Sequence, residues 1–344
     1  MSDVTVIKPG MLTTVQDGGR IGYQQYGVTV SGVMDHYAYR MANWLVGNQE
    51  KEAVLEVTLL GPTLEINKDM VVAITGGDLG PKLNGQPMAQ WTSVALSPGD
   101  TLSFAGIRSG CRGIIAFGGG IQVPSLMGSR STYTRGRMGG LEGRALQPGD
   151  TLAIGQASTP ASQVLGRKGI PHDFGTTNQG EPLLIRVVPG PQEDAFTEEG
   201  LATFYNESYQ VSSESDRMGC RLSGPAVAHK KSADIISDGI AMGAIQVPGH
   251  GNPIIMMADR QTTGGYTKIA NVITVDLPKI AQVKPGESIR FKAVTVEEAQ
   301  RLIMEEEALF NQLAKQGDDS SLDKARRFVV KVKGKTYHVT LEER

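Results

Sequence analysis

The amino-acid sequence predicts a mainly β fold made of two β-rich units. The first observation is a series of short apolar, β-branched runs between residues 53 and 154, each bounded by turn residues. The second is composition: 43 glycines and only 6% aromatic residues are typical of many short strands joined by tight turns. The third is a length of 344 residues, which favours two hydrophobic cores over one.

A recurring turn supports the division into two units. Pro98-Gly99-Asp100, Pro148-Gly149-Asp150 and Pro285-Gly286-Glu287 each place Pro-Gly and an acidic residue before a predicted strand. Proline fixes φ at the second position of a type II turn, and glycine accepts the positive φ at the third. The recurrence at the end of each half suggests two related units.

Only a few helices are expected. Apolar residues at helical spacing predict a helix over 36–46, with Asp35 as its N-cap. The acidic segment 192–205 predicts a short helix. The capping box Thr295-Val296-Glu297-Glu298 opens a longer amphipathic helix. Residues 328–341 alternate in polarity around Lys-Gly-Lys and predict a terminal hairpin appended to the core.

These elements predict four segments in the chain. We expect a first unit over 1–160, a connector over 161–180, a second unit over 181–294 and a C-terminal extension of helix and hairpin over 295–344. The connector lies where periodicity is lost and Ser, Thr, Pro and Gly accumulate.

Charge and cysteine content exclude several classes of protein. The net charge of −2 and the lack of a basic run argue against a nucleic-acid partner. Cys111 and Cys220 provide no disulfide framework, so a reducing compartment is expected. No signal sequence and no apolar run of membrane-spanning length is present, so we predict a cytoplasmic protein with no membrane partner. The five histidines are scattered without metal-ligand spacing, and no metal is expected.

The stretch from 235 to 271 carries the strongest concentration of functional residue types. Two short apolar runs each end in a polar, Gly-rich turn, which is where binding residues gather on a rigid scaffold. Gly264 and Gly265 could form a backbone nest for an anion, with Thr262 supplying a hydroxyl and Lys268 a positive charge. No GxxxxGK[ST] sequence occurs, so a conventional P-loop is excluded.

Two further segments could contribute to a site. Arg217 and Arg221 can bind a carboxylate or a phosphate in fork geometry. A solvated turn with local ion pairs is the alternative, and composition alone favours it. In the first half, Gln16, Asp17 and Arg20 could face a ligand or could simply cap their own loop.

Six motifs then occur in the order found in one known family. The chain resembles the KipA family, also called allophanate hydrolase subunit 2 or the biotin-dependent carboxyltransferase domain, whose bacterial members include the C subunit of 5-oxoprolinase. The motifs that carry the resemblance are Val15-Gln16-Asp17-Gly18-Gly19-Arg20, Ser31-Gly32-Val33-Met34-Asp35, the run 215–222, Ser237-Asp238-Gly239-Ile240, Ile245-Gln246-Val247-Pro248-Gly249 and the run 259–270.

The resemblance implies a fold, an activity and partners. The fold would be two cyclophilin-like β-barrel units. The chain would act as the C subunit of an ATP-hydrolysing 5-oxoprolinase, an amide hydrolase that converts 5-oxo-L-proline to L-glutamate. Its partners would be a KipI-like and a LamB/YcsF-like subunit, with ATP used by the assembled complex.

The resemblance leaves two alternatives open. One is a KipA-type regulator that binds and antagonises a KipI-like kinase inhibitor. The other is a urea-type carboxyltransferase component. The chain carries no biotinyl-lysine motif of the Met-Lys-Met kind, so no biotin is expected to be attached to it.

Motif position and chemistry together suggest roles for the site residues. Arg217 and Arg221 would hold the substrate carboxylate or a phosphoryl group, and Asp259 would orient a group or accept a proton. Lys268 would offset developing negative charge. The residues expected to contact the substrate amide or the cofactor, or to contribute from the first half or an interface with another subunit, are Gln246, Gln261, Thr262, Tyr266, Asp17, Arg20, Gly264 and Gly265.

Overall fold

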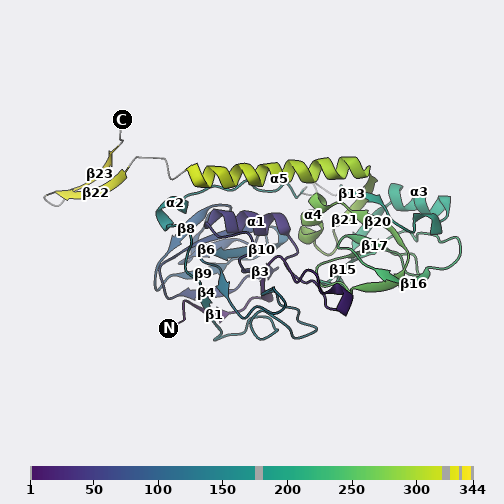
Figure 1. The fold of residues 1–344 in the computed structure, drawn as a ribbon, viewed down its shortest axis with the longest axis horizontal. Helices are drawn as coiled ribbons and strands as arrows, with labels where there is room; N and C mark the ends of the chain where they lie inside the picture. The colour runs from purple at the N-terminus through teal and green to yellow at the C-terminus, as the bar shows by residue number, and fades with distance from the viewer. Residues whose placement is uncertain (1, 175–180, 320–325, 333–334, 342–344) are drawn as a thin grey trace.

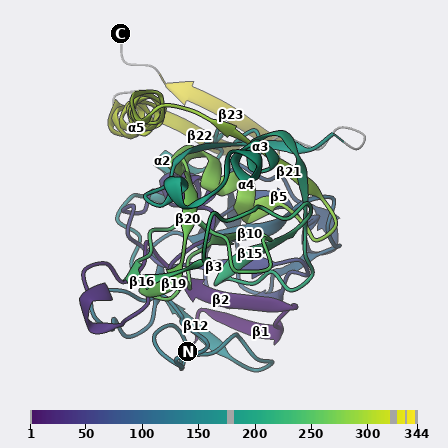
Figure 2. The same ribbon diagram turned by 90° about the vertical axis from the view of Figure 1, so that its right-hand side faces the viewer.

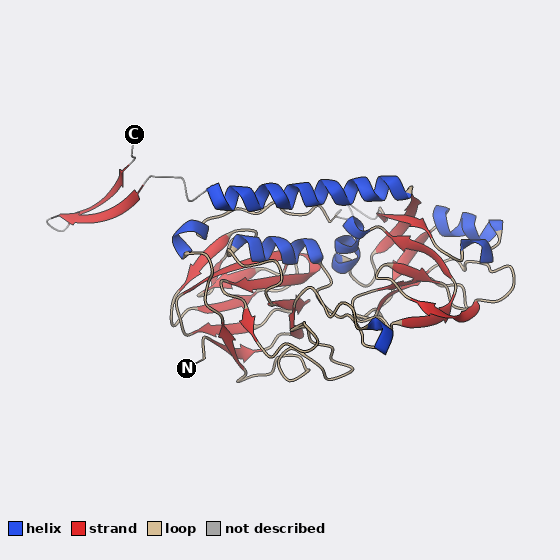
Figure 3. Cartoon of the chain, viewed as in Figure 1, coloured by secondary structure: helices blue, strands red, loops and turns tan. Residues whose placement is uncertain are grey.

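Two β-rich lobes lie side by side, and one long helix, α5 (Val296–Asp319), runs along both of them (Figures 1 and 3). The structure is a computed structural model that describes all residues except 1, 175–180, 320–325, 333–334 and 342–344. None of the helices in the described ranges is long and apolar enough to cross a membrane. The predicted mainly β class is confirmed.

The first lobe is built from two open sheets. Its strands are β1 (Val4–Lys8), β2 (Leu12–Gln16), β3 (Val54–Thr58), β4 (Thr63–Ile66), β5 (Met70–Asp78), β6 (Pro81–Leu83), β7 (Gln86–Pro87), β8 (Ser93–Leu96), β9 (Thr101–Phe104), β10 (Ser109–Phe117), β11 (Ile121–Gln122) and β12 (Thr151–Ile154). The strand orders are β11-β12-β1-β4-β9-β6-β7 and β2-β3-β10-β5-β8. The first of the two expected β-barrel units is therefore not closed, because no ladder in the described residues joins one sheet to the other.

One helix covers the five-stranded sheet of the first lobe. The helix α1 (His36–Leu45) begins at Asp35, whose carboxylate accepts a 2.9 Å hydrogen bond from the backbone N–H of Ala38. The predicted N-cap is therefore confirmed. The buried face of α1 packs on β5 and β10, with Met41 and Leu45 fully inside.

The second lobe is a closed barrel. Its strands are β13 (Leu183–Pro189), β14 (Ser208–Val211), β15 (Gly219–Ser223), β17 (Ala244–Gln246), β18 (Ile254–Met256), β20 (Lys268–Val272) and β21 (Ser288–Ala293). The ring β13-β20-β17-β18-β15-β14-β21 closes through parallel pairing of β13 with β21. Phe204 and Phe291 stack in its core at a centroid distance of 4.5 Å.

Short helical segments complete the second lobe. The acidic segment predicted as one helix forms a 3-10 turn, η3 (Glu193–Ala195), followed by α3 (Glu198–Asn206). A further 3-10 turn, η4 (Thr274–Asp276), leads into α4 (Leu277–Gln282). Two strands outside the barrel, β16 (Asp234–Gly239) and β19 (Thr263–Tyr266), pair only with each other among the described strands, and we call them the ribbon.

The connector begins against the first lobe. It contains the short helix α2 (Ala161–Val164), and Gly169 then donates a 2.7 Å backbone hydrogen bond to the carbonyl of Trp91. The hydroxyl of Tyr37 donates a 3.0 Å bond to the carbonyl of Ile170. Residues 161–170 are thus held along one lobe by specific hydrogen bonds.

The helix α5 contacts both lobes. Near its start, Ala299 packs with Ile273 and Val275 of the second lobe. Further along, Phe310 contacts Tyr37 of α1, and Trp44 Nε1 donates a 2.9 Å hydrogen bond to the carbonyl of Leu313. The helix predicted as part of an appended extension therefore links the two lobes.

The predicted terminal hairpin is confirmed as a strand pair. Strands β22 (Arg326–Val332) and β23 (Lys335–Leu341) are antiparallel, and Figure 1 shows them away from both lobes. The turn predicted between them lies outside the described residues.

Candidate functional site

A buried ion-pair network lies where the two lobes meet. The guanidinium of Arg217 donates 3.0 and 3.1 Å hydrogen bonds to the carboxylate of Asp259, from Nε and Nη2. Its Nη1 pairs with Glu56 of β3 in the first lobe, and its Nη2 also bonds the carbonyl of Gly32. Burial lowers the pKa of Arg217, but the two carboxylates more than offset this effect, so the pKa is raised overall.

Arg217 and Asp259, each predicted to act on the substrate, are brought together, but they bind each other. Ser31 Oγ donates a 2.7 Å bond to Asp259 Oδ1, so that carboxylate is also occupied. Arg221 lies elsewhere, exposed on β15 beside a small cavity of about 210 Å³ lined in part by His250. Arg217 is buried in the ion-pair network, whereas Arg221 is exposed beside another cavity. The structure therefore does not bring together the two arginines predicted to bind one anion.

Asp17 and Arg20 organise a loop of their own lobe. Asp17 accepts a 2.6 Å hydrogen bond from Ser129 Oγ and one from Ser131 Oγ. Arg20 donates 2.7 and 3.1 Å bonds to the carbonyls of Ser131 and Leu126. Both side chains are buried, which matches the capping alternative for these residues.

A second polar group lies at the base of the ribbon. Lys268 is buried, and its Nζ donates a 2.9 Å bond to Asp238 Oδ2 and a 3.2 Å bond to the carbonyl of Gly239. The ammonium hydrogen bond is the largest cause that lowers the pKa of Asp238. Lys268 is the cross-strand partner of Gln246 in the β17–β20 pair. The side chains of these two residues therefore project from the same face of the sheet.

Two side-chain amides converge over Gly264. A Cβ at that position would lie 2.8 Å from Gln246 Nε2 and 3.3 Å from Gln261 Nε2, so only glycine leaves room for both. Gln246 Nε2 also donates a 3.4 Å bond to the carbonyl of Tyr266. We call Gln246, Gln261 and Lys268 the donor cluster, because each presents N–H groups at the ribbon base.

The Gly-Gly pair has a different conformation from the one expected. Gly264 and Gly265 lie within β19, and neither has a positive φ. The anion nest needs alternating backbone handedness, so it is not formed there. The backbone carbonyl of Thr262 instead accepts a 3.1 Å hydrogen bond from the backbone N–H of Ile240.

Two residues of this region, Glu56 and Arg260, were not predicted from the sequence as part of a site. The sequence places Glu56 only in a strand, yet a charged residue inside the apolar run Val54–Val57 is a signal of a buried ion pair. Arg260 is also buried, with bonds of 2.9 and 3.2 Å to the carbonyls of Ile240 and Met257. Its only signal is its place beside Asp259 and Gln261.

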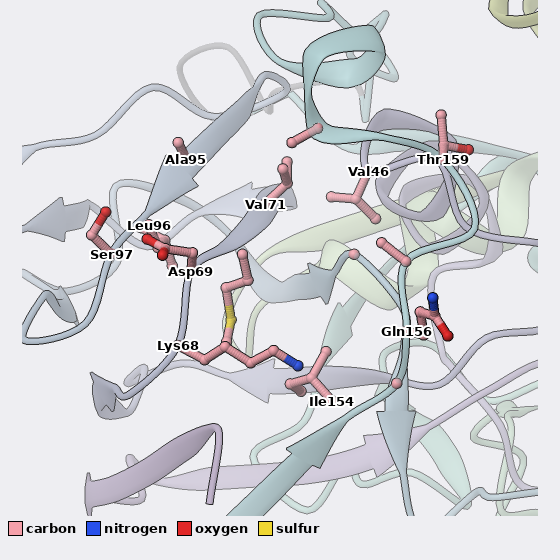
Figure 4. Close-up of a pocket in the computed structure, with 15 residues that line it drawn as sticks. Val46, Lys68, Asp69, Val71, Ala95, Leu96, Ser97, Ile154, Gln156 and Thr159 are labelled. Carbon is pink, nitrogen blue, oxygen red and sulfur yellow. The ribbon is translucent and has the colours of Figure 1, made fainter.

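Two cavities lined by described residues lie away from the donor cluster. One of about 390 Å³ in the first lobe is lined mainly by apolar side chains such as Val71, Leu96 and Ile154 (Figure 4). Another, of about 420 Å³, lies between the lobes and includes Trp91 and Lys279. Among the residues that the structure describes, no group of three or more His, Cys, Asp or Glu side chains could hold a metal ion.

The chain is similar to proteins of one known family. The model of the family "Carboxyltransferase domain, subdomain A and B" matches residues 26–293. The C subunit of 5-oxoprolinase from Escherichia coli (strain K12) is 38% identical over 90% of this chain and 97% of its own length. The same subunit from Haemophilus influenzae is 36% identical over 90% of this chain and 96% of its own length.

Larger proteins contain a similar region. The urea amidolyase of Saccharomyces cerevisiae is 35% identical over 87% of this chain, which spans 17% of that protein. The crystal structure of Kluyveromyces lactis urea amidolyase matches with a TM-score of 0.84 and 34% identity, covering 90% of this chain and 20% of that one. The chain therefore belongs to the carboxyltransferase domain family of subdomains A and B.

Proposed function

We propose that this chain is the C subunit of a multi-subunit, ATP-dependent 5-oxoprolinase that converts 5-oxo-L-proline to L-glutamate in the cytoplasm. The observation that carries the proposal is the 38% identity to such a subunit over 97% of that protein's length. The urea amidolyases, in contrast, are several times longer than this chain. The proposed partners are a KipI-like and a LamB/YcsF-like subunit, and ATP belongs to the assembled complex.

We assign the substrate to the donor cluster. A lactam carbonyl oxygen accepts hydrogen bonds, and Gln246 and Gln261 place two amide donors close together. Negative charge grows on that oxygen when the ring amide is attacked, and the buried ammonium of Lys268 would stabilise it. Thr262 precedes the ribbon and Tyr266 lies on it. Arg217 and Asp259 would help to hold the two lobes in position.

The ribbon face suits a partner protein. Ile236 of β16 is 95% exposed, and Tyr266 of β19 is also exposed. Beside the ribbon lies η1 (Gln24–Tyr26), purple in Figures 1 and 2, with Tyr26 exposed. Exposed apolar side chains gathered around a polar site are typical of an interface, and we assign the KipI-like subunit to this face.

The family relationship also suggests a more specific description of the fold and of the domain boundaries. We propose that the closed barrel is cyclophilin-like and that the functional units are residues 1–160 and 181–294. Each unit has its own apolar core, although Met34 of the first unit packs into the core of the second.

A carboxyltransferase role is the second candidate, and the similarity to urea amidolyase favours it. Carboxyl transfer to urea would also use amide donors and a buried cation. The two candidates differ in the partner they need, because carboxyl transfer requires a biotin carboxylase and a biotin carrier. Carboxylation of urea by this chain with those partners, and no glutamate release from 5-oxo-L-proline, would select the carboxyltransferase.

The test is reconstitution with each component omitted in turn. This chain and its KipI-like and LamB/YcsF-like partners are mixed with ATP and 5-oxo-L-proline, and glutamate is measured. The proposal expects release only from the complete mixture. Full release without this chain would overturn the proposal.

A further inference from the structure

Among the described residues, three arginine side chains are buried, and Arg260 differs from the other two because no carboxylate contributes to its electrostatic surroundings. Arg217 pairs with Glu56 and Asp259, and Arg20 lies within the electrostatic influence of Asp17 and Asp259. Arg260 is 8% exposed, and no carboxylate of the described residues offsets its burial. Burial alone lowers the pKa of Arg260, without a compensating charge.

The guanidinium of Arg260 is nevertheless held in a fixed place. Its Nε donates a 2.9 Å hydrogen bond to the carbonyl of Ile240, and its Nη1 donates a 3.2 Å bond to the carbonyl of Met257. Its Nη2 makes no hydrogen bond to a described residue. A buried cation without a counter-ion is unfavourable for folding, and buried charges with perturbed surroundings are candidates for ligand binding.

Ile240 connects this arginine to the donor cluster. Its carbonyl holds Arg260, and its backbone N–H bonds the carbonyl of Thr262 at 3.1 Å. Its Cδ1 lies 2.5 Å from the point where a Cβ on Gly264 would be, which is the point where the amides of Gln246 and Gln261 converge. Ile240 therefore lies between the guanidinium of Arg260 and the amides of Gln246 and Gln261.

We propose that Arg260 binds the carboxylate of the substrate, while the donor cluster binds its amide carbonyl. This inference rests on the proposed function, because 5-oxo-L-proline is a small cyclic amide that carries a carboxylate. Arginine suits the task since its planar N–H groups match a carboxylate, and Nη2 is the group left available. An acidic side chain of the KipI-like partner is the other source of a carboxylate, and the experiment separates the two.

The test compares two ligands in the reconstituted complex with Arg260→Gln. A charge-assisted hydrogen bond of ordinary strength predicts that KM for 5-oxo-L-proline rises about 10- to 100-fold, with a smaller change in kcat. Inhibition by 2-pyrrolidinone, which has the lactam but no carboxylate, should be the same in the variant and the wild type. Arg290→Gln on the exposed side of β21 is the matched control and should leave KM unchanged.

Stability and assembly distinguish binding from a structural role. Arg260→Gln removes an uncompensated charge, so its Tm should equal or exceed that of the wild type, whereas Arg217→Gln should lower Tm. An unchanged KM would overturn the inference while leaving the proposed function in place. Weaker binding of the KipI-like partner with an unchanged KM would overturn it in favour of a carboxylate from that partner. Absence of glutamate release from the wild-type complex would overturn both proposals.

Discussion

The hydroxyl of Ser31 donates a 2.7 Å hydrogen bond to Oδ1 of Asp259, joining residues 228 positions apart in the chain. The same carboxylate is bonded by Arg217, which also pairs with Glu56 of the first lobe. The proposed site region of the second lobe is therefore linked to the first lobe by a buried, charged network. Such a network is sensitive to the loss of a single partner, because the remaining charges stay desolvated.

Replacing Arg217 tests this network. Arg217→Met leaves Glu56 and Asp259 buried without a counter-ion, so the free energy of unfolding should fall by about 3–5 kcal/mol. Urea-induced unfolding measures the change. Arg221→Met, at an exposed arginine four residues later, should change stability by no more than about 0.5 kcal/mol. Equal stability of the two variants would show that the network is not needed for folding.

Replacing Phe310 tests the link made by α5. Phe310 is buried against Tyr37, and the guanidinium of Arg40 lies 4.0 Å from its ring centroid. Phe310→Ala should lower the free energy of unfolding by about 3 kcal/mol or more, by loss of buried area and creation of a cavity. Met304→Ala is the control on the same helix, because Met304 is 71% exposed. A Phe310 variant no less stable than this control would contradict the link.

The buried N-cap Asp35 should make stability depend on pH. Burial raises its pKa from 3.8 to about 7, despite hydrogen bonds from Ala38 and Gln282 that lower it. Between those pH values the folded chain keeps a proton that the unfolded chain has released. The contribution of Asp35 to the free energy of unfolding therefore falls as pH rises, by up to about 4 kcal/mol over the window.

Asp35→Asn isolates this contribution. Burial lowers the pKa of His36 to about 4, so the contribution of His36 to the free energy of unfolding rises with pH. Because both proteins contain His36, this contribution cancels in the comparison. The stability of the wild type relative to Asp35→Asn should therefore decline from pH 4 to pH 7, as followed by thermal unfolding. A difference that does not change with pH would show that Asp35 is not protonated in the folded chain.

Gly264 tests the convergence of the two amides. A Cβ there would lie 2.5 Å from Ile240 Cδ1 and 2.8 Å from Gln246 Nε2, so Gly264→Ala must displace the amide. We expect glutamate release by the complex to fall about 10-fold or more, as for the loss of one hydrogen-bond donor to the reacting oxygen. Gly249→Ala is the control, since no atom lies within 4 Å of its Cβ position. Similar activities of the two variants would exclude the proposed role of the amides.

Local elements could be predicted from the sequence because their signals are local. The N-cap at Asp35, the capping box at Thr295 and the terminal hairpin follow from adjacent residue types. The open form of the first lobe could not be predicted, because closure depends on which distant edge strands meet. Nor could the path of α5 along both lobes, since an apolar stripe does not specify what it packs against.

In the candidate site, too, local features could be predicted from the sequence and long-range contacts could not. The residue types around 235–271 predict a site in this region, and the structure brings Gln246, Gln261 and Lys268 together there. The pairing of Arg217 with Glu56 joins residues from different lobes, and no local pattern indicates such a contact. The unpaired state of Arg260 depends on what lies around it in space, which spacing along the chain does not show.

The most direct test of the account is the activity of a complex that contains Lys268→Met. Lys268 is buried and hydrogen-bonds Asp238 at the ribbon, and we propose that it stabilises charge on the substrate oxygen. Glutamate release should fall about 100-fold or more, while Tm and binding of the KipI-like partner stay unchanged. Lys292→Met, at an exposed lysine of β21, should retain full activity. Release at the wild-type rate by the Lys268 variant would contradict the proposed site.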